Sequence, residues 1–215
     1  MYSRKRRRKI RFLITAGGTR EYIDPVRFIS NASSGKMGYE LAKSAIAAGH
    51  NVTLITAPTS LEIPKKASVI KVESAREMFK SVKEEFNGCD CLIMTAAVSD
   101  YTPVKSARHK MKKSSKGITL KLKPTQDILK WAGNHKKRNQ AVVGFALEDK
   151  DIKTGAQRKM HEKKLDMVIA NTPSAIGSER SKIQIKKNGG KWREFSDMPK
   201  KQAARKLIQL IEQSI

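Results

Sequence analysis

The chain has 215 residues, with 45 lysines and arginines against 20 aspartates and glutamates, and its formal net charge is +25. This length suits one well-buried core, so we expect a single domain over 10–215 that follows a basic N-terminal tail over 1–9. The longest apolar runs are too short to span a bilayer and no apolar stretch follows the tail as in a signal peptide. These features exclude a membrane protein and favour the cytoplasm.

Such a positive charge admits three causes: nucleic-acid binding, an anionic small-molecule substrate, or a general surface bias. Lysine and arginine are scattered over the whole chain, and no aromatic residues alternate with the basic run at 4–9 to stack on bases. We therefore expect no nucleic-acid partner. A basic α/β protein that binds nucleotides or nucleic acid without catalysis is the alternative.

The first half of the chain alternates strand and helix signals. Apolar runs and helical spacing predict strand, helix, two strands, helix and strand over Arg11–Ala16, 39–48, 52–55, 69–72, Ala75–Phe86 and 91–97. A polar loop is expected between Gly18 and Gly35. Cys89 and Cys91 are too close together for an ordinary disulfide, so we expect buried, reduced thiols.

The second half begins with a lysine-rich stretch, 102–117, that has few apolar residues and is predicted to form a mobile flap. After it we predict an edge strand, a short helix, a buried strand, a helix, a strand, a hairpin turn and a final helix over 118–122, from 128, Ala141–Leu147, 151–164, 167–170, 186–190 and from 199. This alternation predicts an α/β, Rossmann-like three-layer fold with a mostly parallel central sheet.

The loop after the first strand carries Gly17, Gly18 and Thr19. It matches neither the dinucleotide fingerprint nor the P-loop, although adjacent glycines let backbone N–H groups approach an anion closely and Thr19 adds a hydroxyl. A nicotinamide-dependent enzyme would also need an acidic residue after the second strand, where the chain has Ile55-Thr56-Ala57.

A second loop precedes the first predicted helix. The sequence NASSGKMG, over 31–38, combines an amide, two hydroxyls, two glycines and a lysine just before a helix N-terminus, which is the composition of a phosphate site. The alternative for this loop alone is a helix cap by Ser33 or Ser34.

Five motifs occur in order along the chain: GGTREYIDPVRFISNASSGKMG, AAVSDY, a lysine cluster, GFALED and KMHEKKLDMVIAN. This series resembles the phosphopantothenoylcysteine synthetase family, the second half of the bacterial bifunctional coenzyme A biosynthesis flavoprotein, over nearly all of the chain after Ile10. The resemblance implies a ligase that joins 4′-phosphopantothenate to L-cysteine through an acyl-nucleotide intermediate. Such an enzyme must hold two polyanions close together, which requires cations and N–H donors.

The resemblance also implies roles for individual residues. Asn31 would stabilise the acyl-nucleotide, Arg27 would orient the substrate, and Lys110 on the flap would contact the triphosphate. From composition alone, the favoured interpretation of Arg27 is a solvated surface arginine and that of Lys110 is a member of an exposed charge run. The nucleotide would be bound by Gly17, Gly18, Thr19, Ser33, Ser34, Gly35, Lys36, Met94, Thr95, Ala96, Asp100, Lys110, Gln126, Asp127, Ile128, Leu129, Phe145, Lys159 and Lys163.

One position departs from the family pattern, since Gln126 stands where the family usually has proline. The loop at 32–38 looks like the bacterial form, which favours CTP over ATP as co-substrate. The resemblance further implies Mg²⁺ held mainly by the triphosphate, no flavin, a separate decarboxylase protein in the pathway, and a homodimer in which the flap reaches toward the partner. The sequence identifies no metal ligands in the protein itself.

Overall fold

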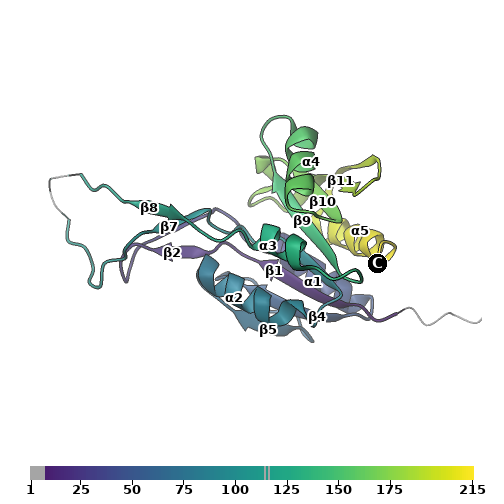
Figure 1. Ribbon diagram of the computed structural model, residues 1–215, viewed down its shortest axis with the longest axis horizontal. Coiled ribbons are helices and arrows are strands. Elements are labelled where there is room, and N and C mark those ends of the chain that lie inside the picture. The colour runs from purple at the N-terminus through teal and green to yellow at the C-terminus, as the bar shows by residue number, and fades with distance from the viewer. Residues whose placement is uncertain (1–7, 114, 116) are drawn as a thin grey trace, which may run out of the picture.

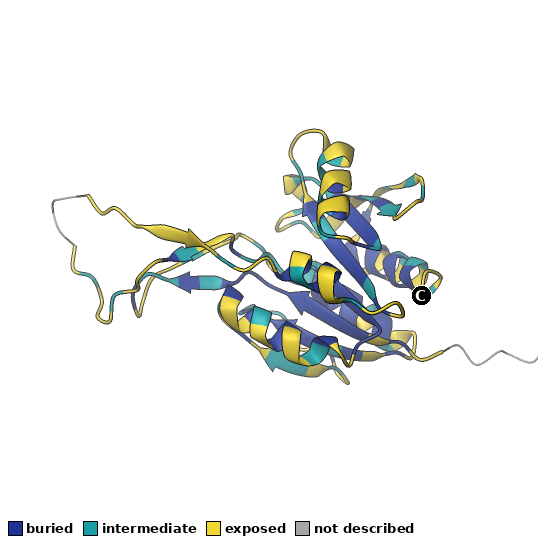
Figure 2. Cartoon of the chain, viewed as in Figure 1, coloured by how far each residue is buried: buried dark blue, intermediate teal, exposed yellow. Residues whose placement is uncertain are grey.

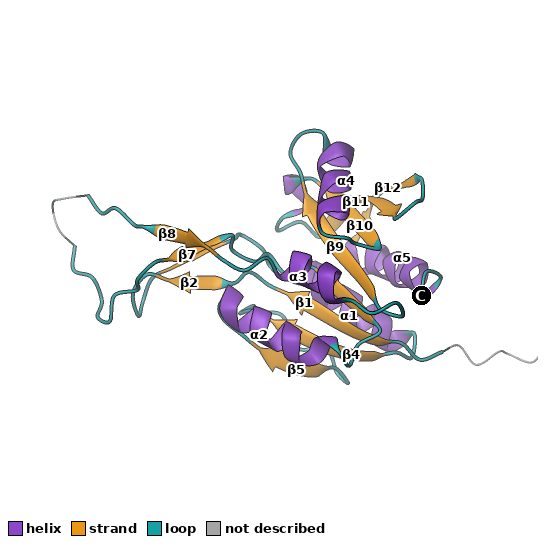
Figure 3. Cartoon of the chain, viewed as in Figure 1, coloured by secondary structure: helices purple, strands orange, loops and turns teal. Residues whose placement is uncertain are grey.

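The computed structural model describes residues 8–113, 115 and 117–215. Its centre is an eight-stranded sheet, labelled in Figure 1 and coloured orange in Figure 3, in the order β12-β11-β10-β9-β6-β1-β4-β5. The strands are β1 Arg11–Ala16, β4 Asn51–Thr56, β5 Ser68–Lys71, β6 Cys91–Met94, β9 Ala141–Leu147, β10 Met167–Asn171, β11 Arg180–Lys187 and β12 Trp192–Pro199. All neighbours from β5 to β10 pair in parallel, while β11 and β12 form an antiparallel edge hairpin.

Helices cover both faces of this sheet. Helices α1 (Lys36–Ala47) and α5 (Lys200–Glu212) pack on one face, and α2 (Ala75–Phe86), α3 (Ile128–His135) and α4 (Ile152–Glu162) pack on the other. Successive strand residues point to opposite faces, so Phe12 and Ile14 lie with α1 and Leu13 lies with α2. The central strands are therefore buried on both sides, as the dark blue arrows in Figure 2 show. The predicted three-layer α/β fold is confirmed.

Two small antiparallel sheets form an arm that extends from the body at one end of the molecule (Figure 1). One pairs β2 (Arg20–Tyr22) with β3 (Phe28–Ser30), and the other pairs β7 (Tyr101–Pro103) with β8 (Leu122–Pro124). The lysine-rich stretch 102–117, in its described residues, lies within this arm. Its mobility stays a prediction, and positions 114 and 116, like the tail residues 1–7, lie outside the described residues.

Three predictions of local structure were wrong. The polar loop before Gly35 contains β2 and β3, which are too short to give a periodic signal. The edge strand expected over 118–122 begins at Leu122, because pairing with β7 starts there. The strand expected over 91–97 ends at Met94, since side-chain hydroxyls then take over: Thr95 donates to the carbonyl of Thr15, and the Ala96 N–H donates to the Thr15 hydroxyl at 3.2 Å.

A 3₁₀ helix, η1 (Pro173–Ala175), connects β10 to β11 and lies over the carboxyl ends of the strands. Within the part of the chain that the structure describes, every helix is too short or too polar to cross a membrane.

Candidate functional site

A cleft of about 720 Å³ lies at the carboxyl ends of the parallel strands. Its floor is formed by residues that follow β6 and end β9 and β10. Its walls come from the loop before α1, the start of α3, the inner side of α4 and the first residue of α5. This is the edge at which open α/β sheets bind ligands.

The N-terminus of α1 opens into this cleft. Gly35 precedes the helix with φ +77° and has no side chain to cap it, the Ser34 hydroxyl accepts from the Lys36 N–H at 3.4 Å, and the first turn holds no acidic residue. Gly38 lets the helix approach the strands closely, because a Cβ atom there would lie 2.5 Å from the Thr95 hydroxyl and 2.6 Å from the Ala16 side chain. The other N–H groups of the first turn and the helix dipole together favour an anion at this end of the cleft.

Asn31 joins this loop to the one after β6. Its amide nitrogen lies 3.3 Å from the carbonyl oxygen of Ala97 and 3.2 Å from that of Val98, and it donates to both. Its side chain is exposed at the cleft. An amide held between two loops at the cleft is oriented by the protein, and a small rotation would let it donate to a ligand oxygen.

A first group of charges lies on the side of α3 and α4. Asp127 caps α3 by accepting from the Lys130 N–H at 2.9 Å, and its carboxylate pairs with Lys163 at 2.8 Å. Burial alone would raise the pKa of Asp127, but Lys163 and the Lys130 N–H outweigh it and hold that pKa below its usual value.

Lys159 lies one helical turn before Lys163 and donates to the carbonyl oxygen of Phe145 at 2.7 Å. Burial and the charge of Lys163 lower the pKa of Lys159, against the opposing effect of Glu148, Asp127 and Asp100. A partly desolvated lysine without a close carboxylate partner has much to gain from an incoming anion.

A second group of cations faces the cleft from the opposite helix layer. Lys200, at the start of α5, is 5% exposed and donates to the carbonyl oxygen of Ala175 at 2.8 Å. Lys36, in the first turn of α1, pairs with Glu179, whose side chain is 75% exposed. The pKa of Lys200 is lowered by burial and by Lys36, while Glu179 opposes this. A solvated carboxylate such as Glu179 is easily replaced by a ligand phosphate.

Most of the residues predicted from the sequence come together here. The cleft is lined by Asn31, Ser33, Ser34, Gly35, Lys36, Met94, Thr95, Ala96, Asp100, Gln126, Asp127, Ile128, Leu129, Phe145, Lys159 and Lys163. Their binding roles remain predictions. The sequence did not point to Asn171, Ile176 or Lys200, which also line the cleft, because nothing in their local pattern distinguishes them from an ordinary strand end, loop and helix start.

Five predicted residues lie elsewhere. Gly17, Gly18 and Thr19 form the support behind the cleft: Gly18 bridges to Ala97, and the buried Thr19 hydroxyl accepts from the Ser99 N–H at 2.9 Å. Arg27 and Lys110 belong to the arm, outside the cleft lining. If Arg27 and Lys110 act on a ligand bound in a cleft, the arm must carry them to that ligand.

Few carboxylate side chains line the cleft. Among the described residues, histidine, cysteine, aspartate and glutamate do not gather in groups of three or more around a common point. The two carboxylates lining the cleft, Asp100 and Asp127, are oxygen donors of the kind that Mg²⁺ accepts.

The model of the DNA/pantothenate metabolism flavoprotein C-terminal domain family matches residues 7–215. The chain is 45% identical over 204 residues to the coenzyme A biosynthesis bifunctional protein CoaBC of Bacillus subtilis, covering 93% of the chain and 50% of the relative. It is 46% identical over 180 residues to a cysteine/cysteine sulfinic acid decarboxylase of an unknown prokaryotic organism, covering 81% of the chain and 50% of the relative.

The crystal structure of the C-terminal domain of a coenzyme A biosynthesis bifunctional protein CoaBC superposes with a TM-score of 0.83 at 36% identity. The match covers 95% of the chain and 94% of that domain. The chain thus spans about half the length of the curated relatives it matches and nearly all of the solved C-terminal domain.

Proposed function

Since the chain belongs to the DNA/pantothenate metabolism flavoprotein C-terminal domain family, we propose that it acts in coenzyme A biosynthesis as a phosphopantothenate–cysteine ligase. It joins 4′-phosphopantothenate and L-cysteine to give 4′-phosphopantothenoylcysteine, and it works in the cytoplasm. The similarity to the C-terminal domain of CoaBC, of which the chain covers 94%, supports this proposal over the name of the decarboxylase relative, of which it covers 50%.

Support comes above all from the two groups of lysines that face one cleft from opposite helix layers. Lys159 stands on α4 and Lys163 directly follows it, while Lys36 and Lys200 stand on α1 and α5. A reaction between a nucleoside triphosphate and a phosphorylated acid requires two polyanions to lie side by side against their repulsion. Two separate cation groups at one cleft suit that requirement.

In the proposed first step, the carboxylate of 4′-phosphopantothenate attacks the α-phosphorus of CTP and pyrophosphate leaves. In the second, the amine of cysteine attacks the acyl carbonyl of the acyl-cytidylate and CMP leaves, after the amine has lost a proton. Asn31 donates to the acyl oxygen as negative charge develops on it. Arg27 holds the substrate, and Lys110 contacts the phosphates.

The nucleotide is proposed to lie toward α3 and α4. Phe145 contacts the base, Asp100 takes a ribose hydroxyl, and the backbone of 94–96 allows close approach. We favour CTP over ATP, with Mg²⁺ held mainly by the triphosphate, which fits the small number of carboxylates at the cleft. We propose no flavin for this domain.

We also propose a homodimer that is formed through the arm. Of the large apolar residues that are exposed, seven lie on the arm: Val26, Phe28, Tyr101, Val104, Ile118, Leu120 and Leu122. Exposed apolar residues gathered on one projecting element favour contact with another protein surface. A partner's arm would also supply the Arg27 and Lys110 that the cleft of a single chain does not include.

The test is to incubate the purified protein with 4′-phosphopantothenate, cysteine, Mg²⁺ and either CTP or ATP. Pyrophosphate release and the mass of the product are followed in wild type, Asn31→Ala and Asn31→Asp. We expect CTP to give pyrophosphate and the cysteine adduct, Asn31→Ala to slow adduct formation, and Asn31→Asp to abolish it, because a carboxylate repels the carbonyls of Ala97 and Val98. A folded wild-type protein that turns over neither nucleotide contradicts the proposal.

A further inference from the structure

The turn between β2 and β3 contains a carboxylate that is removed from solvent. Asp24 is 1% exposed, and its two oxygens accept four hydrogen bonds. Oδ1 accepts from the N–H groups of Val26 and Arg27, both at 2.8 Å. Oδ2 accepts from the Arg27 guanidinium and from the N–H of Met111, both at 3.2 Å. One side chain thus binds Arg27 twice and a segment 87 residues away once.

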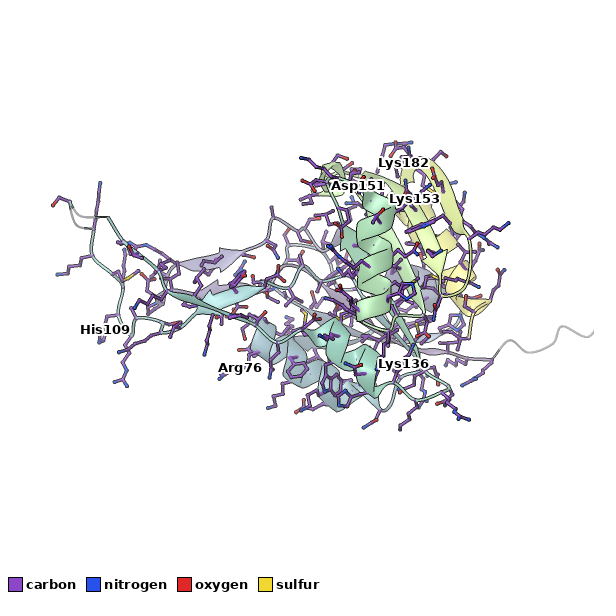
Figure 4. The ribbon with its side chains drawn as sticks, turned by 45° about the horizontal axis from the view of Figure 1, so that its top comes forward. Arg76, His109, Lys136, Asp151, Lys153 and Lys182 are labelled. Carbon is purple, nitrogen blue, oxygen red and sulfur yellow. The ribbon has the colours of Figure 1, made fainter. Side chains whose placement is uncertain are left out.

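Two further bonds tie the same segment to the hairpin. The Ser106 hydroxyl donates to the carbonyl oxygen of Tyr22 at 2.5 Å, and the Ala107 N–H donates to that of Ile23 at 2.8 Å. Residues 106–111 therefore run along the β2–β3 hairpin instead of standing free. Lys110 lies inside this tied stretch, next to Met111, while its neighbour His109 lies far out on the arm (Figure 4).

The hairpin itself is stiffened by its aromatic residues. Tyr22 and Phe28 pack edge to face with ring centres 5.5 Å apart, and the Arg20 guanidinium lies 4.5 Å from the Phe28 ring centre. The unit to which Asp24 fastens 106–111 is thus held in one shape.

We propose that Asp24 is a positioning residue that fixes Arg27 and the Lys110 segment relative to each other, so that the arm presents both cations to the substrates as one unit. The inference rests on the proposed function, which gives Arg27 and Lys110 their roles. Without Asp24, the Arg27 side chain, which is 43% exposed, would keep no fixed direction, and 106–111 would lose its innermost attachment.

Asp24 keeps its charge over the working range of an enzyme. Burial alone would raise its pKa, but the N–H groups of Val26, Arg27 and Met111, together with the charge of Arg27, hold the pKa below its usual value. The attachment is therefore intact at neutral pH.

Asp24→Asn tests the inference with little change in shape. An amide oxygen at the Oδ1 position still accepts from Val26 and Arg27 and keeps the turn, whereas an NH₂ group cannot accept from Met111 or from the guanidinium. We expect faster hydrogen exchange in the peptide that contains 107–111 and at least a tenfold fall in kcat for the adduct. The double variant Asp24→Asn with Arg27→Gln should show a much smaller fall in kcat than the product of the two single falls.

Asp90→Asn is the matched control, because Asp90 is also a buried carboxylate bound by an arginine but lies at the opposite edge of the sheet. Ser106→Ala is a milder variant at an exposed position, and it loosens the segment while leaving Arg27 untouched. We expect it to speed exchange at 107–111 and to lower kcat less than Asp24→Asn does.

Unchanged exchange at 107–111 in Asp24→Asn contradicts the inference, and so does turnover no lower than that of the Asp90→Asn control. So does a Ser106→Ala protein whose arm exchanges faster while its kcat stays at the wild-type value. Failure of the proposed function looks different: the wild-type protein then forms no adduct, while the exchange measurement still reports whether Asp24 holds the arm.

Discussion

The central sheet has an amino edge, where its parallel strands begin, and a carboxyl edge, where they end, and the two use polar residues in opposite ways. At the amino edge, one polar residue stands directly before each of four parallel strands: His50, Asp90, Gln140 and Asp166 precede β4, β6, β9 and β10. At the carboxyl edge, the residues after the strands are mostly small, and the charged groups arrive from helices. One edge is closed by the protein itself, and the other is open.

Each of the four residues at the amino edge forms hydrogen bonds with backbone groups of a neighbouring segment. His50 Nδ1 accepts from the Ile10 N–H at 3.2 Å, Asp90 from the Arg11 N–H at 2.8 Å and Asp166 from the Val142 N–H at 2.7 Å, while the Gln140 amide donates to the carbonyls of Phe86 and Cys89 at 2.6 and 2.9 Å. Lys159 and Lys200, at the other edge, donate only to backbone carbonyls among the bonds seen in the described residues. Hydrogen bonds made within the protein at the amino edge stabilise the fold. The lysine ammonium groups at the carboxyl edge have donors left over that can bind a ligand.

The largest effect we expect is slow chemical labelling of the Cys89 thiol, which lies at the closed amino edge. Burial raises the pKa of the Cys89 thiol to about 12, so at about pH 8 its thiolate fraction is roughly three orders of magnitude below that of a free cysteine. Iodoacetamide labelling followed by mass spectrometry should therefore be slower than in the urea-unfolded protein by about a thousandfold. Asn188→Cys, at an exposed turn, is the positive control and should label at once. Rapid labelling of native Cys89 would mean that the amino edge opens readily.

A second prediction concerns the open edge. Lys159→Met keeps most of the side-chain volume and removes the charge, so we expect about a hundredfold fall in kcat/KM for the nucleotide, the size typical of losing one preorganised donor. Lys153→Met is the matched control on the same helix, since Lys153, near the start of α4 (Figure 4), pairs with Glu194 at 2.6 Å and neither residue lines the cleft. Equal kinetics for the two variants would remove Lys159 from the site.

The third prediction concerns Lys200, the cation that the sequence did not reveal. Lys200→Met should raise KM by about tenfold for one of the two polyanionic substrates, since one charge-assisted contact is lost. Steady-state kinetics with each substrate varied separately tells which polyanion lies beside α5. The adjacent Lys201→Met, at an exposed position, is the control. If neither KM changes, Lys200 has a purely structural role.

The body of the fold was predictable because its signals are local. β1 and β9 lie in continuous apolar runs, α2 has an apolar face, and each is bounded by polar or glycine residues, so their bounds agree with the predictions. The arm was not predictable in the same way. Its strands are three residues long and partly exposed, and each pairs through tertiary arrangement rather than through an apolar pattern.

The candidate site also contains residues that local sequence patterns could identify and residues that they could not. The loop over 31–38 could be identified because an entire phosphate-binding combination lies in eight consecutive residues. Lys200 could not, since its relation to Lys36 and Ala175 exists only after α5 has packed beside α1. Asp24 was equally hidden, because its bond to Met111 spans the chain from the first hairpin to the lysine-rich stretch.

The smallest effect we expect is a change in stability at the amino edge. Asp90 is buried and bonded by the side chain and the N–H of Arg11, which together hold its pKa below the usual value. Asp90→Asn should lower the free energy of unfolding by about 1–2 kcal/mol at neutral pH, because a charged hydrogen-bond acceptor is replaced by a neutral one. Adduct formation should not change. Urea unfolding followed by circular dichroism measures the first quantity.

The pH dependence sharpens this prediction. Because the folded pKa of Asp90 lies below the unfolded value, its stabilisation is complete above about pH 4 and is lost as pH falls through the folded pKa. The difference between wild type and Asp90→Asn should therefore shrink in acid. Asp197→Asn, which breaks an exposed pair with Arg180, should cost less than about 1 kcal/mol at any pH. If Asp90→Asn costs no more than Asp197→Asn, the amino edge is not held by its buried carboxylate, and the contrast between the two edges lies only in their shape.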